Sequence, residues 1–218
     1  MYKNIQILGF GPYYVAVLHD LIRGNSISEN IKVFKNLSSS PQPVVFTKPL
    51  DLNIYENETF VEENNPCVFG VSGGNNKLRV FEYFKKKYNI VEEAYVSIID
   101  QSTNIALSVE IGLGCVLEQN VSVSAQTKFG FGVSVKRGVN IGHHCLIGKF
   151  VDINPGSTIA GKAKIGAGTT VGAGAVILDG VHIGENTIIG AGSIVTKNIP
   201  SNVIAYGSPC RIIRAIIT

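Results

Sequence analysis

The residues from 99 to 200 repeat every six positions without losing phase, and this repeat limits the possible folds more than any other feature. Seventeen consecutive hexads begin with an apolar residue, which is aliphatic in all but one case. The fifth position is small or β-branched almost throughout, and the second position is often Gly. The first positions are Ile99, Ile105, Ile111, Leu117, Val123, Phe129, Val135, Ile141, Ile147, Ile153, Ile159, Ile165, Val171, Ile177, Ile183, Ile189 and Val195.

A period of six fits neither a helix, in which apolar residues recur about every 3.6 positions, nor a long strand, in which they recur at every second position. It does fit a short strand followed by a corner, because the fifth position and the next first position lie two residues apart and share one face of a strand. Gly at the second position is expected to permit the tight corner. A fixed short period indicates a solenoid. With three hexads in each triangular coil, the repeat predicts almost six coils.

Composition and charge limit the partners and the compartment. The chain has 218 residues and a formal net charge of +3, which is too small to indicate nucleic-acid binding. No apolar run is long enough to span a membrane. The N-terminal residues enter a strand pattern directly, without the layout of a signal peptide. We therefore expect a cytoplasmic protein without a membrane or nucleic-acid partner.

The four cysteines lack the spacing of a metal site, and no metal is expected. Cys115 and Cys145 fall on the inward fifth position, and Cys67 lies in an apolar strand pattern. Only Cys210 is expected at the surface. Free thiols are typical of a cytosolic protein.

The first 95 residues predict a small parallel α/β (Rossmann-like) domain, and residues 96–218 predict the repeat domain with a C-terminal tail. Strands are expected at 4–8, 31–34 and 67–71, with a further short strand at 44–46 in a loop-rich stretch. Helices are expected from residue 15 to 22 and from 78 to 88. A ligand is expected at the carboxyl ends of the strands. Gly9 and Gly11 form a turn that could hold a phosphate, but the third Gly of the dinucleotide motif is Tyr14, and a plain turn is an equal alternative.

The repeats resemble those of the bacterial hexapeptide-repeat acyltransferases, and nearly the whole chain resembles their sugar branch. That branch contains sialic acid O-acetyltransferases and N-acetyltransferases of nucleotide-linked 4-amino sugars. The resemblance implies a left-handed parallel β-helix, acetyl-CoA as co-substrate, a sugar or nucleotide-sugar acceptor for bacterial surface glycans, and a homotrimer with sites between the prisms. It is carried by Gly9-x-Gly11, Phe69-Gly70, 75–79, 141–150, Pro155-Gly156, 189–192 and 207–209.

His143 and His144 are the strongest candidates for chemistry, because they occupy the outward third and fourth positions of a hexad. A neutral imidazole can accept a proton near neutral pH, as acyl transfer to an amine or hydroxyl requires. The resemblance makes His143 the general base. The family usually has an acid next, where this chain has His144, and often a second His nine residues on, where it has Asp152. We expect that Asp152, or an acid of a neighbouring subunit, holds an imidazole in the right tautomer; Glu118 is a second outward acid.

The resemblance also implies binding residues. Those for coenzyme A are Gly161, Ala173 and Ala191, with Arg211 and Lys197 as cations that could meet phosphates. Those for the sugar substrate are Gly9, Gly11, Asn75 and Lys136. The nucleotide-sugar branch carries acids after its second strand, whereas this chain has Lys35 and Asn36, so the nucleotide stays open.

Two other classes of function fit the sequence less well. One is a catalytically silent β-helix that serves as a binding or scaffold protein. The other is a metal enzyme of the γ-carbonic anhydrase type, which needs three converging His residues. The chain has only four, His19, His143, His144 and His182. The acceptor, and the choice between N- and O-transfer, also stay open.

Overall fold

The computed structural model describes residues 1–35, 48–55 and 64–216. Two compact units are present. The first consists of residues 1–72 and 76–98, and the second of residues 73–75 and 99–218. Each unit is described by itself. The expected strand at 44–46 lies outside the described residues.

The N-terminal unit is built on a four-stranded parallel sheet in the order β3-β2-β1-β4. The first helix packs its apolar face inward, because Val15, Leu18, Leu21 and Ile22 are all buried. Strand β3 was not predicted: it has only three residues, none of them buried, so its sequence carries no alternation. The elements are β1 (Tyr2–Leu8), α1 (Pro12–Gly24), β2 (Ser28–Phe34), β3 (Asn53–Tyr55), β4 (Cys67–Phe69), α2 (Gly74–Tyr88) and a 3-10 turn (Glu92–Ala94).

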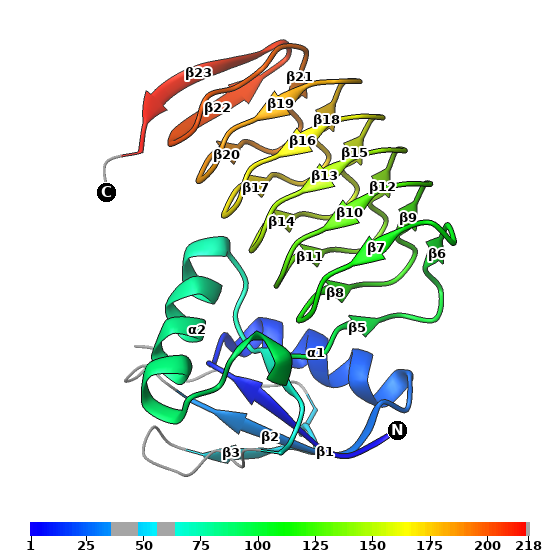
Figure 1. The fold of residues 1–218 in the computed structure, drawn as a ribbon, viewed down its shortest axis with the longest axis vertical. Helices are drawn as coiled ribbons and strands as arrows, with labels where there is room; N and C mark the ends of the chain where they lie inside the picture. The colour runs from blue at the N-terminus through cyan, green and yellow to red at the C-terminus, as the bar shows by residue number, and fades with distance from the viewer. Residues whose placement is uncertain (36–47, 56–63, 217–218) are drawn as a thin grey trace. The chain divides into compact units, whose positions relative to one another are not determined.

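The repeat unit is a parallel β-helix of seventeen two-residue strands, β5 to β21, and each strand ends on the first position of its hexad (Figure 1). Strands three hexads apart pair in parallel, as Asn140 does with Thr158, so the coil length of three hexads is confirmed.

The strands form three sheets. The six-stranded sheet contains β6 (Asn104–Ile105), β9 (Ser122–Val123), β12 (Asn140–Ile141), β15 (Thr158–Ile159), β18 (Val176–Ile177) and β21 (Ile194–Val195). The five-stranded sheet contains β7 (Glu110–Ile111), β10 (Lys128–Phe129), β13 (Leu146–Ile147), β16 (Lys164–Ile165) and β19 (His182–Ile183). The eight-stranded sheet contains β5 (Ile98–Ile99), β8 (Val116–Leu117), β11 (Ser134–Val135), β14 (Asp152–Ile153), β17 (Thr170–Val171), β20 (Ile188–Ile189) and a C-terminal pair.

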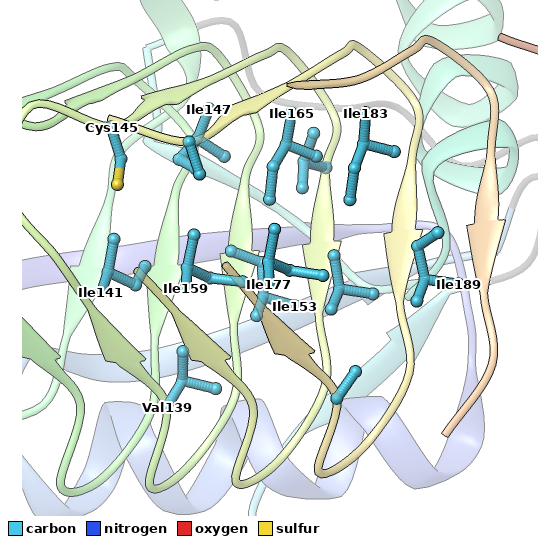
Figure 2. Close-up of a cluster of buried hydrophobic side chains, with 14 of the residues drawn as sticks. Val139, Ile141, Cys145, Ile147, Ile153, Ile159, Ile165, Ile177, Ile183 and Ile189 are labelled. Carbon is cyan, nitrogen blue, oxygen red and sulfur yellow. The ribbon is translucent and has the colours of Figure 1, made fainter. Parts of the chain in front are cut away.

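First-position side chains stack in rows inside the coils. Figure 2 shows Ile147, Ile165 and Ile183 in one row, and all three are nearly inaccessible to solvent. Where the inward fifth position is polar, its hydroxyl is satisfied by a backbone carbonyl, as in Thr127 Oγ1 to Gly142 O at 2.8 Å. Such pairing avoids the cost of a buried unsatisfied hydroxyl.

The corners correct one prediction about glycine. The positive φ falls on the fourth position of the hexad, for example 68° at Gly114 and 58° at His144, and not on the second. Gly is needed at the second position for a different reason, because neighbouring coils approach closely there. A β-carbon on Gly142 would lie 2.6 Å from the backbone N of Gly161.

The C-terminal tail contains two strands that the sequence did not predict. Strands β22 (Val203–Gly207) and β23 (Cys210–Ala215) form an antiparallel pair, and β22 adds in parallel to β20. The tail thus extends the eight-stranded sheet. Cys210 is 5% exposed and packs with the core, so its predicted surface position is wrong.

Candidate active site

His143 and His144 lie in the turn between β12 and β13, where the six-stranded and five-stranded sheets meet. Both side chains are exposed, so their predicted outward direction is confirmed. Their Nδ1 atoms are 3.1 Å apart, and the two rings meet edge to face with an interplanar angle of 86°. Each imidazole therefore restricts the orientation of the other.

This histidine pair limits the tautomers of His143. A hydrogen bond between two Nδ1 atoms needs a proton on one of them. When His143 Nδ1 is the donor, its Nε2 carries the free lone pair and can accept a proton. His144 would then orient His143, a role that the family resemblance gives to an acid at this position.

The third positions of every third hexad, one in each successive coil, form a column along this corner. We call this column, His143, Gly161, Asp179 and Lys197, the His143 column. A β-carbon on Gly161 would lie 2.8 Å from His143 Nε2 and 2.8 Å from Asp179 Oδ1. Gly161 thus leaves open the space that both side chains face. Asp179 was not predicted, although counting two coils of three hexads from His143 leads to it.

The backbone of Gly161, a residue predicted to bind coenzyme A, uses its carbonyl in the coil but not its N–H. Its carbonyl accepts the Gly180 N–H at 2.9 Å, and the Lys162 N–H donates to His143 O at 2.8 Å. Among the residues that the structure describes, the Gly161 N–H itself has no acceptor. A free N–H beside an imidazole can stabilise developing negative charge on a carbonyl oxygen.

Ala173, Ala191 and Lys136 lie on a different corner, between the eight-stranded and six-stranded sheets, which we call the Ala173 corner. The Gly192 N–H donates to Ala173 O at 2.8 Å, and Lys136 Nζ donates to Asn154 Oδ1 at 2.7 Å. One chain therefore does not bring these predicted binding residues to His143 and Gly161.

The two predicted acids are less accessible than expected. Asp152 lies in β14 of the eight-stranded sheet, is 2% exposed, and accepts a hydrogen bond from the Gly73 N–H. Asp152 thus lies on the eight-stranded sheet, whereas the turn that carries His143 joins the other two sheets. Glu118 is also 2% exposed, and its carboxylate pairs with Arg137 at 3.4 Å.

The turn after β1 uses its glycines for packing within the N-terminal unit. The Gly9 N–H donates to Phe34 O and the Gly11 N–H donates to Gly70 O, at 2.8 and 2.7 Å. A β-carbon on Gly70 would lie 2.2 Å from Gly9 O. Two of the N–H groups considered for a phosphate are therefore already bonded, which favours the plain-turn alternative for them.

The remaining predicted residues are at the surface. Asn75 is exposed near the start of α2, and Arg211 is exposed on β23, where its Nη1 donates to Cys210 O at 3.0 Å. Neither has a contact that identifies a ligand.

Cys145 lies directly after the histidine pair but is inert. The side chain points into the core, with Sγ 3.2 Å from Ala160 O. Burial raises the pKa of the Cys145 thiol, and hydrogen bonds from the backbone and Thr127 only partly oppose this. Because the thiolate is the nucleophile, this residue is not suited to covalent catalysis.

Within the described part of the chain, no three His, Cys, Asp or Glu side chains gather as metal ligands. None of its helices is long and apolar enough to cross a membrane.

Comparison with known proteins gives a match over the later repeats and over the whole fold. Residues 162–197 match the family model described as bacterial transferase hexapeptide (six repeats). The acetyltransferase domain of PglB from Neisseria gonorrhoeae FA1090, in complex with acetyl coenzyme A, superimposes with a TM-score of 0.82 at 20% identity, covering 98% of this chain and 100% of that one. The chain has the fold of hexapeptide-repeat acetyltransferases.

Two further solved structures share this fold. A variant of perosamine N-acetyltransferase from Caulobacter crescentus, in complex with CoA and GDP-perosamine, has a TM-score of 0.80 at 22% identity and covers 98% of both chains. WeeI from Acinetobacter baumannii AYE has a TM-score of 0.77 at 21% identity, covering 98% of this chain and 100% of that one. No curated protein matches the sequence. The predicted fold class, a small α/β unit followed by a left-handed parallel β-helix, is confirmed.

Proposed function

We propose that the protein transfers an acetyl group from acetyl-CoA to the amino group of a nucleotide-linked sugar. The observation that carries this proposal is the arrangement at the His143 column. There an exposed imidazole, held by His144, lies against Gly161, whose N–H has no acceptor among the described residues. The fold shared with proteins that bind acetyl-CoA, CoA or GDP-perosamine supports the same donor and class of acceptor.

The chemistry assigned to each group follows from its position. The acceptor nitrogen attacks the thioester carbon, so that a C–N bond forms and the C–S bond breaks. His143 Nε2 takes the proton that the nitrogen loses, and this proton then goes to the leaving sulfur to give coenzyme A. The Gly161 N–H stabilises the oxyanion of the tetrahedral intermediate. No other reactant is needed.

We further propose that the complete site forms between copies of the chain. The predicted coenzyme A residues occupy two corners of one β-helix, Gly161 on one and Ala173 and Ala191 on the other. A cyclic homotrimer would place the Ala173 corner of one copy beside the His143 column of the next.

The N-terminal unit is the proposed sugar-binding part. Its parallel sheet offers the carboxyl ends of β1 and β4 as the ligand edge. There, Gly9 and Gly11 shape the turn after β1. Asn75, near the start of α2, is proposed as a further sugar contact. We also propose a cytoplasmic location, which the free thiols and acetyl-CoA as donor support.

The test is release of coenzyme A thiol from acetyl-CoA with a panel of acceptors. The panel contains UDP-, dTDP- and GDP-linked 4-amino-4,6-dideoxy sugars and sialic acid, and the product is identified by mass spectrometry. We expect turnover with one amino sugar and N-acetylation of it. Acetylation of sialic acid alone would show that the acceptor is a sugar hydroxyl and not the amino group of a nucleotide-linked sugar. Absence of acetyl-CoA binding by calorimetry would overturn the proposal.

A further inference from the structure

Asp179 faces His143 across Gly161, although it lies two coils further along the chain. Asp179 Oδ1 and His143 Nε2 are each 2.8 Å from the point where a Gly161 β-carbon would lie, so the two atoms are separated by at most twice that distance. In the described residues, no hydrogen bond or ion pair joins the two side chains directly. Both side chains thus lie against Gly161, where a side chain at that position would crowd them.

We propose that Asp179 is the positioning residue for His143, and that its carboxylate stabilises the imidazolium formed during acyl transfer. This rests on the proposed function. The proton moves from the acceptor nitrogen to His143 Nε2, while the carboxylate stays ionised and accepts no proton. An opposite charge at this separation favours the protonated imidazole without holding it in a permanent ion pair. The same carboxylate can accept an N–H of the incoming amine.

Asp179 suits this role better than the other acids of the same chain. Asp152 is buried in another sheet against Gly73, and Glu118 is paired with Arg137. The Asp179 carboxylate, by contrast, is close enough to the His143 turn to affect the buried thiol of Cys145. Burial is the main cause of the raised pKa of this thiol, and the negative charge of Asp179 raises it further.

Glycine at position 161 is part of the arrangement. Any side chain there would stand between the imidazole and the carboxylate, because its β-carbon would be within 2.8 Å of both. The order His, Gly, Asp in three successive coils therefore leaves a gap in the column that lets the two groups act together. The other titratable or charged side chains around His143 are His144 beside it, the buried Cys145, Lys162 in the next coil, and Lys197 one coil beyond Asp179.

The first test compares Asp179→Asn with Asp179→Glu and with Glu185→Gln. Glu185 is an exposed acid at the same hexad position on a different corner, so its variant controls for the change in net charge. We expect Asp179→Asn to lower kcat by about 10- to 100-fold, the range seen when a positioning partner is removed, with an unchanged KM for acetyl-CoA. Asp179→Glu should recover part of the loss. A kcat for Asp179→Asn equal to that of Glu185→Gln would overturn the proposal.

The second test needs no acceptor and therefore separates this proposal from the proposed function. The imidazole resonances of the four histidines are recorded by NMR in the full-length protein at one fixed pH, and those of His143 are assigned with His143→Gln. We expect the His143 ring signals to move in Asp179→Asn relative to wild type, because the imidazole loses the carboxylate that faces it across Gly161. Glu185→Gln should leave them in place. Unchanged His143 ring signals in Asp179→Asn would overturn the role of Asp179, even if acetyl transfer is found.

Discussion

At the residue scale, the histidine pair shows how far a repeat can be interpreted from sequence. The hexad phase places His143 and His144 outward, and the structure agrees. Their mutual hydrogen bond could not be predicted, because it depends on ring rotation and on the left-handed backbone of His144, with φ 58°. The same limit applies to Asp179. Its place in the column follows from counting, but its approach to His143 depends on the missing side chain of Gly161.

The buried Cys67 predicts a specific loss of stability in alkali. Burial raises the pKa of this thiol to about 12 in the folded chain, from 9.0. Between these values the unfolded chain binds fewer protons, so the free energy of unfolding falls as the pH rises, with a slope of up to about 1.4 kcal/mol per pH unit from this group. The contribution is fully present below pH 9 and is lost towards pH 12.

Urea unfolding of wild type and Cys67→Ala at pH 8, 9.5 and 11 measures this effect. Cys67→Ala should lose less stability than wild type between pH 9.5 and 11, whatever its stability at pH 8. Equal losses in the two proteins would show that the Cys67 thiol is not the group responsible.

At the scale of elements, the first-position rule predicted every strand from β5 to β21, because burial alone fixes which residue points inward. It did not predict β22 and β23. Strand β22 forms on the edge of β20, and β23, whose residues Arg211 to Ile213 carry no period, forms by pairing with β22. The short β3 is a similar case, since it pairs with the edge of β2. Pairing with an existing sheet is a tertiary effect that local sequence does not contain.

Strand β20 offers a direct test of the burial rule, because its two residues are both Ile. Ile189 is fully buried and Ile188 is 41% exposed. We expect Ile189→Ala to lower the free energy of unfolding by about 2–5 kcal/mol, because it leaves a cavity between coils. The matched variant Ile188→Ala should cost about 1 kcal/mol or less. Comparable losses in chemical denaturation would contradict the inward assignment.

At the scale of the whole molecule, the repeat determines the coil but not its hand or its assembly. Six-residue spacing is compatible with either hand, and the left-handed turn was taken from the resemblance and is borne out by the shared fold. The distribution of the proposed binding residues over two corners is our reason to propose a trimer. Counting in coils of three hexads assigns residues to corners, but it does not determine how copies of the chain meet.

Subunit complementation tests this assembly. His143→Ala removes the base, and Ala173→Trp blocks the other corner, so we expect each variant alone to be inactive. When the two are unfolded together and reassembled, random mixing should restore about a quarter of the wild-type activity, because some interfaces combine an intact His143 with an intact Ala173. A mixture that forms trimers but stays inactive would place both residues in one subunit's site. A monomer in sedimentation would exclude the shared site.

The measurement that tests the central claim most directly is acetyl transfer by His143→Gln and His182→Gln, side by side with wild type. His182 is an exposed histidine on β19, away from the His143 column, so its variant controls for loss of an imidazole. With the best acceptor of the panel, we expect kcat to fall by about 100-fold or more in His143→Gln, the usual contribution of a general base. His182→Gln should match wild type. Retention of wild-type kcat by His143→Gln, with acetyl-CoA still bound, would contradict the assignment of this corner as the site of acyl transfer.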